Sequence, residues 1–224
     1  MASLADQIKR AVAVLAGGGV IAHPTETVFG LAADPGSSTA LEKLLALKGR
    51  AEGKGFILLI PDRAILPEFI QPDSLTDPLV NSLIEKFWPG PLTLVLPALS
   101  SISPLLTGGR GTVAVRHSSS VLVQDLLKVW GGAVVSTSAN RADTVVLCDR
   151  QQVFEEFGAE LGYVVSGLCK ASSMPSTILE AYQGQVRLLR PGAVSTASIQ
   201  DVLWGVDPLL TVQAAVGGSE TPPQ

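Results

Sequence analysis

The chain has 224 residues and a formal net charge of -4; 46% of its residues are hydrophobic and 16% are charged. This composition provides enough apolar side chains for a sizeable core and excludes a largely disordered protein. The acidic balance also argues against a protein that coats nucleic acid non-specifically, because such binding depends on clustered Lys and Arg side chains.

Residues 3–17 are predicted to form an amphipathic helix. Ser3 and Asp6 make a capping box, apolar residues recur at helical spacing, and Gly17 supplies a C-terminal stop. The pair Lys9-Arg10 ahead of an apolar stretch imitates a signal peptide, but the caps favour a helix. No apolar run reaches the ~20 residues of a membrane span, so we expect no membrane partner.

The next elements follow from an apolar run and a second capping signal. Residues 19–23 are predicted to form a short buried strand, followed by a polar loop over residues 25–30 that leads back to apolar sequence. Thr39 and Glu42 form another capping box, which predicts a helix over residues 40–47.

A continuous apolar run at residues 56–60, between Gly55 and Pro61, is typical of a strand that is covered on both faces. Further strands are predicted at residues 92–96, 112–115, 133–135, 163–165, 176–179 and 186–189, and helices at 79–88, 120–130, 151–157 and 197–204. This mixture indicates an α/β domain around a mixed or largely parallel sheet. We expect that domain to span residues 1–206 and a loose tail to span 207–224.

Polar side chains recur where the predicted strands end. They are Arg116, Ser138, Asn140, Ser176 and Arg190. In open α/β sheets ligands bind at the carboxyl ends of strands, so the recurrence favours one shared site. Taken singly, each of these residues is more often part of a turn or a helix cap.

The segment after the 40–47 helix concentrates positive charge on flexible backbone. Lys48 and Arg50 flank Gly49, and an ammonium beside a guanidinium can bind phosphate oxygens. The alternative is that these cations only offset the helix dipole and solvate a loop, and spacing alone favours it. The segment is not a Walker loop, because Lys54 stands where that motif requires glycine.

The two cysteines, Cys148 and Cys169, lie far apart in the sequence and form no metal-ligand pattern. We therefore expect no protein-held metal and interpret both residues as buried reduced thiols of a cytoplasmic protein.

Several stretches taken together resemble the TsaC/YrdC family of threonylcarbamoyl-AMP synthases. They are residues 24–31, 48–50, 54–58, 88–93, 113–116, 136–140, 175–177 and 189–192. They occur in the family's order and cover roughly residues 5–193. No single motif would be sufficient, but the ordered set is highly specific.

The resemblance implies a single YrdC-type domain, with a twisted open mixed sheet, flanking helices and a concave, positively charged cleft. It also implies that L-threonine, bicarbonate and ATP form threonylcarbamoyl-adenylate and pyrophosphate, for the modification of tRNA. Mg²⁺ is expected to arrive with the nucleotide. The implied partners are tRNA threonylcarbamoyltransferase proteins, with weak RNA binding as a further option.

Site residues are carried over by position in the motifs. The catalytic, triphosphate-binding KxR motif is Lys48 and Arg50. The other expected ATP contacts are Ser138, Asn140, Ser176 and Arg190. The expected threonine or carbamate pocket is Thr25, Thr27 and Arg116. His23, where the family often has an aromatic residue, is interpreted as structural.

The chain departs from the family pattern in two places. Ala51 replaces a common proline, which is expected to loosen the loop, and Arg141-Ala142-Asp143 replaces Leu-Ser-Gly beside the nucleotide rim. Two alternative functions share the fold. One is a non-catalytic protein that binds tRNA or ribosomal RNA, and the other is a related carbamoyl-transfer enzyme with another acceptor.

Overall fold

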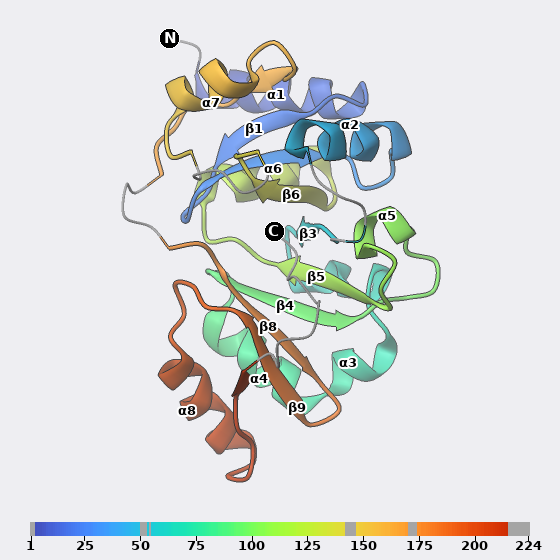
Figure 1. Ribbon diagram of the computed structural model, residues 1–224, viewed down its shortest axis with the longest axis vertical. Coiled ribbons are helices and arrows are strands. Elements are labelled where there is room, and N and C mark those ends of the chain that lie inside the picture. The colour runs from blue at the N-terminus through green and yellow to red at the C-terminus, as the bar shows by residue number, and fades with distance from the viewer. Residues whose placement is uncertain (1–2, 50–52, 54, 142–146, 170–173, 215–224) are drawn as a thin grey trace.

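A computed structural model describes residues 3–49, 53, 55–141, 147–169 and 174–214. Figure 1 shows one twisted sheet with helices on both of its faces. The strands are β1 (Ile21–Pro24), β2 (Phe29–Ala33), β3 (Ile57–Leu59), β4 (Leu92–Pro97), β5 (Thr112–Arg116), β6 (Val134–Ser138), β7 (Tyr163–Val164), β8 (Thr177–Tyr182), β9 (Gln185–Arg190) and β10 (Gln213–Ala214). The helices are α1 (Leu4–Ala16), α2 (Ser38–Lys48), the 3-10 helix η1 (Arg63–Glu68), α3 (Pro72–Thr76), α4 (Pro78–Phe87), α5 (Pro104–Thr107), α6 (Val121–Trp130), α7 (Arg150–Phe157) and α8 (Thr196–Val206).

The sheet is open and mixed, in the order β10-β9-β8-β4-β5-β3-β6-β2-β1-β7. The sheet combines parallel pairs, such as β3 with β5 and β4 with β8, with antiparallel pairs, such as β2 with β6. The predicted α/β class and open mixed sheet are therefore confirmed. No helix in the described part of the chain is long and apolar enough to cross a membrane.

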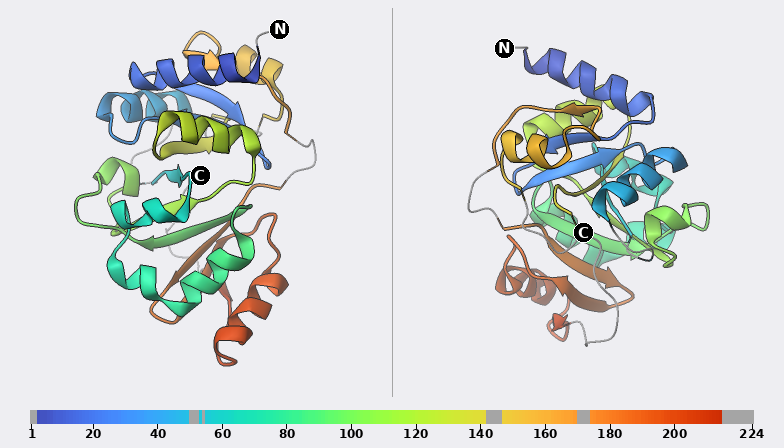
Figure 2. Two further views of the ribbon diagram at one scale, coloured as in Figure 1. Left: turned by 180° about the vertical axis from the view of Figure 1, so that it is seen from behind. Right: turned by 45° about the horizontal axis from the view of Figure 1, so that its top comes forward.

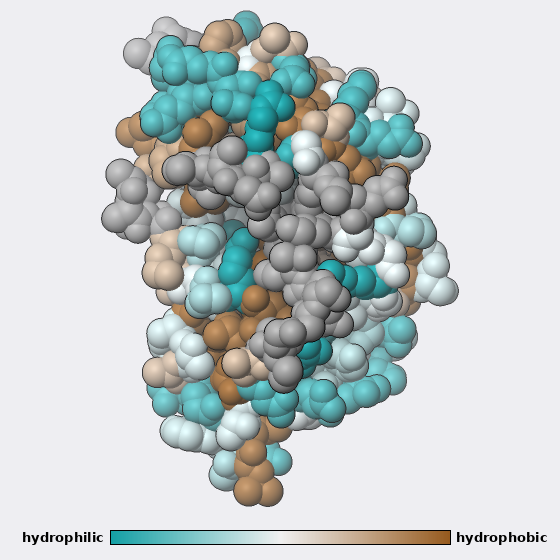
Figure 3. Space-filling view, in the orientation of Figure 1, coloured by the Kyte–Doolittle hydropathy of each residue, from teal (hydrophilic) through white to brown (hydrophobic). Residues whose placement is uncertain are grey.

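Helices cover the two faces of the sheet unevenly. Near β1, β2 and β6, α1 and α6 pack on one face and α2 packs on the other, each against alternate strand residues. Near β4 and β8, α4 and α8 cover the face that is continuous with the α2 face. The other face of the sheet is the one on which α1 and α6 pack. The twist of the sheet turns that face towards the viewer in the lower half of Figure 1 and away from the viewer in the upper half, and Figure 2 shows the same arrangement from behind. Figure 3 shows hydrophilic residues over α7 and apolar residues exposed near β8.

Strand register gathers polar side chains on the face opposite α2 and α4. Ser138 pairs with Gly30 across β6 and β2, and Ser136 pairs with Ile57 across β6 and β3. Arg116 ends β5 at the same level as Leu59 of β3. Paired residues project to the same side of a sheet, so Ser136, Ser138 and Arg116 share one face.

The helix starts test the two capping predictions. Ser3 accepts from the backbone N–H of Asp6 at 3.2 Å and donates to its carboxylate at 2.7 Å, which confirms the first box. The second was wrong: the N-cap of α2 is Ser37, whose hydroxyl accepts from Ala40 N–H at 3.2 Å, and Thr39 lies inside the helix. Ser37 has extended backbone, as an N-cap requires.

Three departures from the predicted elements concern segments whose structure depends on distant partners. The loop predicted at residues 25–30 ends earlier, because β2 begins at Phe29. The predictions left out η1, α3 and α5, which lie between assigned strands. Residues 207–214, placed in the tail, instead bond to α8 through both amide atoms of Gln200, and β10 pairs with β9. Residues 215–224 lie outside the described part.

Gly192 is predicted to be intolerant of any side chain. A Cβ there would lie 2.5 Å from the carbonyl carbon of Ser176 and from the nitrogen of Thr177. We expect Gly192→Ala to lower the free energy of unfolding by about 1–3 kcal/mol, as overpacking does. Gly205, in α8, has nothing within 4 Å of an added Cβ, so Gly205→Ala should stabilise by up to about 1 kcal/mol. Urea denaturation of both variants checks the opposite signs; equal effects would contradict the steric argument.

Candidate active site

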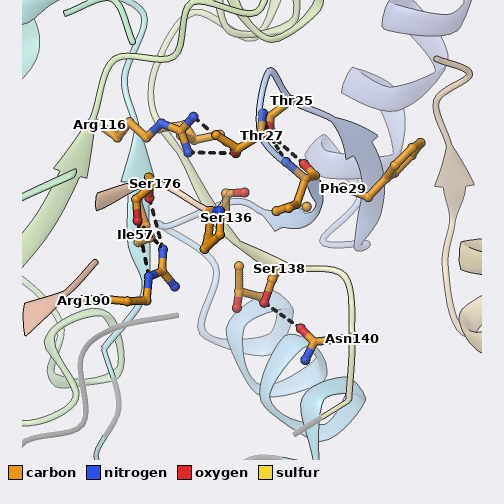
Figure 4. Close-up of a pocket in the computed structure, with 15 residues that line it drawn as sticks. Thr25, Thr27, Phe29, Ile57, Arg116, Ser136, Ser138, Asn140, Ser176 and Arg190 are labelled. Atoms are coloured by element: carbon orange, nitrogen blue, oxygen red, sulfur yellow. Dashed lines mark hydrogen bonds between the residues drawn. The ribbon is translucent and has the colours of Figure 1, made fainter. Parts of the chain in front are cut away.

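A cavity of about 220 Å³ opens on the face of the sheet opposite α2 and α4 (Figure 4). Its wall includes seven of the nine residues that the sequence predicted: Thr25, Thr27, Arg116, Ser138, Asn140, Ser176 and Arg190. Their segments are far apart in the sequence, and the sheet brings them together. Lys48 is not part of this wall, and Arg50 lies outside the described residues.

The turn between β1 and β2 presents two threonine hydroxyls to the cavity. Thr25 Oγ1 donates to Val28 O at 2.7 Å and accepts from the N–H groups of Thr27 and Val28. Its single proton is therefore committed, so in the 2.9 Å contact between the two hydroxyls Thr27 donates to Thr25. Thr27 Oγ1 is then an acceptor for both terminal nitrogens of Arg116, at 3.3 and 3.4 Å.

Arg116 is held by a buried carboxylate that sequence reasoning did not include in the site. Its NH2 lies 2.7 Å from Glu26 Oε1, and its Nε donates to Gly90 O at 3.2 Å. Glu26 also accepts from the Ser118 hydroxyl and from Ser119 N–H. Burial alone would raise the pKa of Glu26, but the Arg116 charge and these hydrogen bonds lower it to about 2. The pair is therefore ionised at neutral pH.

A second guanidinium lines the cavity from β9. Arg190 donates through Nε and NH2 to Ser176 O, at 3.3 and 2.9 Å, and through NH2 to the Ser176 hydroxyl at 3.2 Å. That hydroxyl also contacts Thr93 Oγ1 at 2.9 Å. Burial, with the Arg116 charge, lowers the pKa of Arg190 to about 10, so it stays charged at neutral pH. Among the described residues it has no carboxylate partner, unlike Arg116.

Lys48 lies beneath the turn that follows β6, with its side chain fully buried. Its Nζ donates to Asn140 O at 2.6 Å, to Asn140 Oδ1 at 2.8 Å and to Ser138 O at 2.9 Å. Ser138 Oγ in turn donates to Asn140 Oδ1 at 2.6 Å. The ammonium therefore fixes Ser138 and Asn140, two of the residues predicted to contact the nucleotide, and its own contact with phosphate stays a prediction.

Close approach between β1, β2 and β6 forms the inner wall. A Cβ at Gly30 would lie 2.7 Å from Ser136 Oγ and 3.1 Å from His23 Nε2, so glycine leaves the space that these side chains fill. His23 is fully buried, and burial lowers its pKa to about 4. It is therefore neutral at pH 7 and packs behind the wall.

One family departure points away from the cavity. Arg141 pairs with Glu156 at 2.6 Å and with Glu160 at 3.0 Å, and its guanidinium lies 5.1 Å from the ring centre of Phe157. It also donates to Leu47 O at the end of α2. The residue therefore joins α2 to the α7 region. Ala51, Ala142 and Asp143 lie outside the described residues.

Within the described residues no group of three or more His, Cys, Asp or Glu side chains could hold a metal ion. The donor set of the cavity consists of hydroxyls, an amide and guanidinium groups. Guanidinium groups suit carboxylates and phosphates, and the hydroxyls and amide can bond their remaining atoms. The cavity is therefore suited to an anionic ligand with polar substituents.

Residues 13–192 match the Sua5/YciO/YrdC family model, described as "Telomere recombination". A threonylcarbamoyl-AMP synthase of Nitrosococcus oceani is 41% identical over 179 residues, 80% of this chain and 95% of the relative. One of Photobacterium profundum is 39% identical over 187 residues, 84% of this chain and 100% of the relative.

Solved structures agree on the fold. P. abyssi Sua5 complexed with L-threonine has a TM-score of 0.86 at 26% identity, covering 97% of this chain and 63% of the Sua5 chain. The chain thus spans less than two thirds of the Sua5 length. E. coli YciO shares the fold, with a TM-score of 0.77 at 20% identity, over 89% of this chain and 95% of its own.

The buried ion pair predicts that Glu26→Gln lowers the stability of the fold by an amount that depends on pH. The pKa of Glu26 falls from 4.5 to about 2 on folding, which corresponds to about 3 kcal/mol of stability. The stability that comes from the lowered pKa is fully present above pH ~4.5 and is lost as the pH falls towards 2. We therefore expect the variant to be about 3 kcal/mol less stable at pH 7, with the difference shrinking below pH ~4.5.

Glu156→Gln is the matched control for urea unfolding at pH 7, 4 and 3. Its pair with Arg141 is exposed, at 43 and 40% of the two side chains, so its loss should cost no more than about 1 kcal/mol. A constant stability difference between wild type and Glu26→Gln across this pH range would contradict the role assigned to the ion pair.

Proposed function

Because the chain belongs to the Sua5/YciO/YrdC family, we propose that its cavity binds L-threonine and ATP side by side and joins them through bicarbonate. From its similarity to these relatives, the chain is a threonylcarbamoyl-AMP synthase, an ATP-using nucleotidyltransferase that acts in tRNA modification. The observation that carries the proposal is that two guanidinium groups, from β5 and β9, line one cavity with the hydroxyl and amide groups of three other segments, residues 25–27, 136–140 and 176.

Threonine is assigned to the Arg116 end of the cavity. The guanidinium is fixed by Glu26, Gly90 and Thr27, and its NH1 keeps one N–H that can donate to a carboxylate. The charge of Glu26 offsets part of the guanidinium charge, which suits a ligand group with a single negative charge. The Thr25 and Thr27 hydroxyls lie beside this guanidinium and favour a small polar ligand. P. abyssi Sua5, of the same fold, binds L-threonine.

ATP is assigned to the Arg190 end. Arg190 keeps its full charge without a carboxylate partner in the described part, and Ser176, Ser138 and Asn140 lie on the same wall. We propose that Lys48 acts here through the 138–140 turn that it holds, while Arg50 contacts the triphosphate. Mg²⁺ would enter with ATP as part of the substrate, because the described residues present no metal cluster.

The proposed reaction needs alignment more than acid–base catalysis. Bicarbonate loses hydroxide to give carbon dioxide, and the threonine amine adds to its carbon. The proton that the amine loses combines with the hydroxide to give water, which leaves a carbamate. A carbamate oxygen then forms a bond to the α-phosphorus of ATP as the bond to pyrophosphate breaks. The nucleophile is already anionic, so the chain's contribution is to hold both reactants in line and to stabilise phosphate charge. This is consistent with a cavity whose cations are guanidinium groups and with a buried, neutral His23 beside Ser136 of its wall.

We further propose that the adenylate passes to tRNA threonylcarbamoyltransferase proteins, with weak RNA binding at most. The relatives favour the synthase over non-catalytic RNA binding and over carbamoyl transfer to another acceptor.

The reaction is tested by pyrophosphate release. We expect release only when ATP, L-threonine and bicarbonate are all present, with threonylcarbamoyl-AMP detected by mass spectrometry. Release without threonine, or equal release with unrelated amines, would contradict the proposed substrate. Tight RNA binding that weakens steeply with salt, in the absence of turnover, would instead support the RNA-binding alternative.

Two conservative substitutions test which substrate binds at which end of the cavity. Lysine keeps the charge but loses the fork, so Arg116→Lys should raise KM for threonine by ~10-fold, about the value of one charge-assisted hydrogen bond. Arg190→Lys should raise KM for ATP similarly, and each should leave the other KM within about 3-fold. Arg63→Lys, at an exposed site bonded to Asn81, is the control. If both variants raise the same KM, the assignment of the two ends is wrong.

A further inference from the structure

The two cysteines lie next to each other in the fold although 20 residues separate them in sequence. Asp149 and Leu168 form an isolated antiparallel β-bridge. In an antiparallel pair, the residue before one partner faces the residue after the other. The bridge therefore sets Cys148 opposite Cys169.

This register fits the geometry of a disulfide. Facing residues of an antiparallel pair have Cα atoms roughly 4.5–5.5 Å apart, within the roughly 4.4–6.8 Å that disulfides span. Facing side chains also project to the same side of the ladder. Burial raises the pKa of the Cys169 thiol to about 11, and the charges of Cys148 and Glu26 act in the same direction.

The environments of the two thiols differ. Cys169 is buried, with 8% exposed, and its thiol lies against the backbone of Thr25 in the cavity wall. Cys148 is half-buried, directly before the N-cap of α7, and Leu147 N–H bonds to Ala139 O in the turn after β6. A link between these thiols would join segments that reach two sides of the cavity.

We propose that Cys148 and Cys169 are a redox-responsive thiol pair, which a low-molecular-weight disulfide converts into an intramolecular disulfide across the Asp149–Leu168 bridge. The more accessible Cys148 thiolate attacks one sulfur of the oxidant and releases one thiolate. The Cys169 thiolate then attacks Cys148 Sγ and displaces the second. The two protein thiols lose two electrons and two protons, and the oxidant is reduced to two thiols.

The experiment uses the full chain, reduced, desalted and then incubated at pH 8 with graded ratios of reduced to oxidised glutathione. After acid quenching and alkylation, we expect the intact mass to fall by two hydrogen atoms and both cysteines to escape alkylation. A peptide map should show the two cysteines linked. Reduction should restore both thiols, and the oxidised form should unfold at a higher temperature than the reduced form, because the link closes a loop in the unfolded chain.

Cys148→Ser and Cys169→Ser are the controls, since each can form only a mixed disulfide with glutathione. Urea-unfolded wild type tests whether the fold brings the thiols together: the native chain should favour the internal link over the mixed disulfide by at least ~10-fold more than the unfolded chain does. A glutathione adduct on Cys148 with Cys169 still reactive would overturn the proposal. So would an equal preference in the native and unfolded chains. Neither result depends on synthase activity.

Discussion

The ion pair between Glu26 and Arg116 is the constraint on which the site depends. It joins the turn between β1 and β2 to the end of β5, and through Gly90 it extends to the segment before β4. Removing two charges from water is costly, and here the cost is offset by hydrogen bonds to Ser118 and Ser119 that saturate the carboxylate. With the guanidinium fixed, the proton of Thr27 is fixed as well, because Thr27 can only accept from Arg116 and donate to Thr25.

Lys48 is a second buried charge that fixes a loop of the site, here the 138–140 turn on the other side of the cavity. A buried ammonium has three donors and no acceptor, and the 138–140 turn supplies two carbonyl oxygens and an amide oxygen to meet them. The position of Asn140 is therefore set from beneath by the end of α2, whose chain then turns through the left-handed backbone of Gly49. An acidic chain thus places the cations Arg116 and Lys48 inside its structure, where each orders a loop that lines the cavity.

The sequence predicted those elements whose signals are local. The cap of α1 and the apolar run of β3 depend on neighbouring residues, and both were found. Strand β2 was not predicted, because Gly30, Ala32 and Ala33 have weak strand propensity and owe their conformation to pairing with β1 and β6. The same limit applies to the site. Polar residues at strand ends indicated where it lies, but the partner of Glu26 is 90 positions away and the partners of Lys48 are equally distant, so no local pattern could show that these charges are buried and paired.

The two guanidinium groups of the cavity, Arg116 and Arg190, differ in how far neighbouring groups compensate their charge. The charge of Arg116 is compensated by the Glu26 carboxylate, 2.7 Å away. Arg190 donates only to neutral oxygens of Ser176 and has no carboxylate partner among the described residues. We therefore expect the less compensated positive charge of the cavity to lie towards β9, in a part of the protein where burial reduces solvent screening. A ligand with several negative charges at one end and a single carboxylate at the other would bind in one orientation only. The proposed transfer of the adenylyl group from ATP to the carbamate requires this arrangement, because the carbamate must face the α-phosphorus while pyrophosphate leaves on the opposite side.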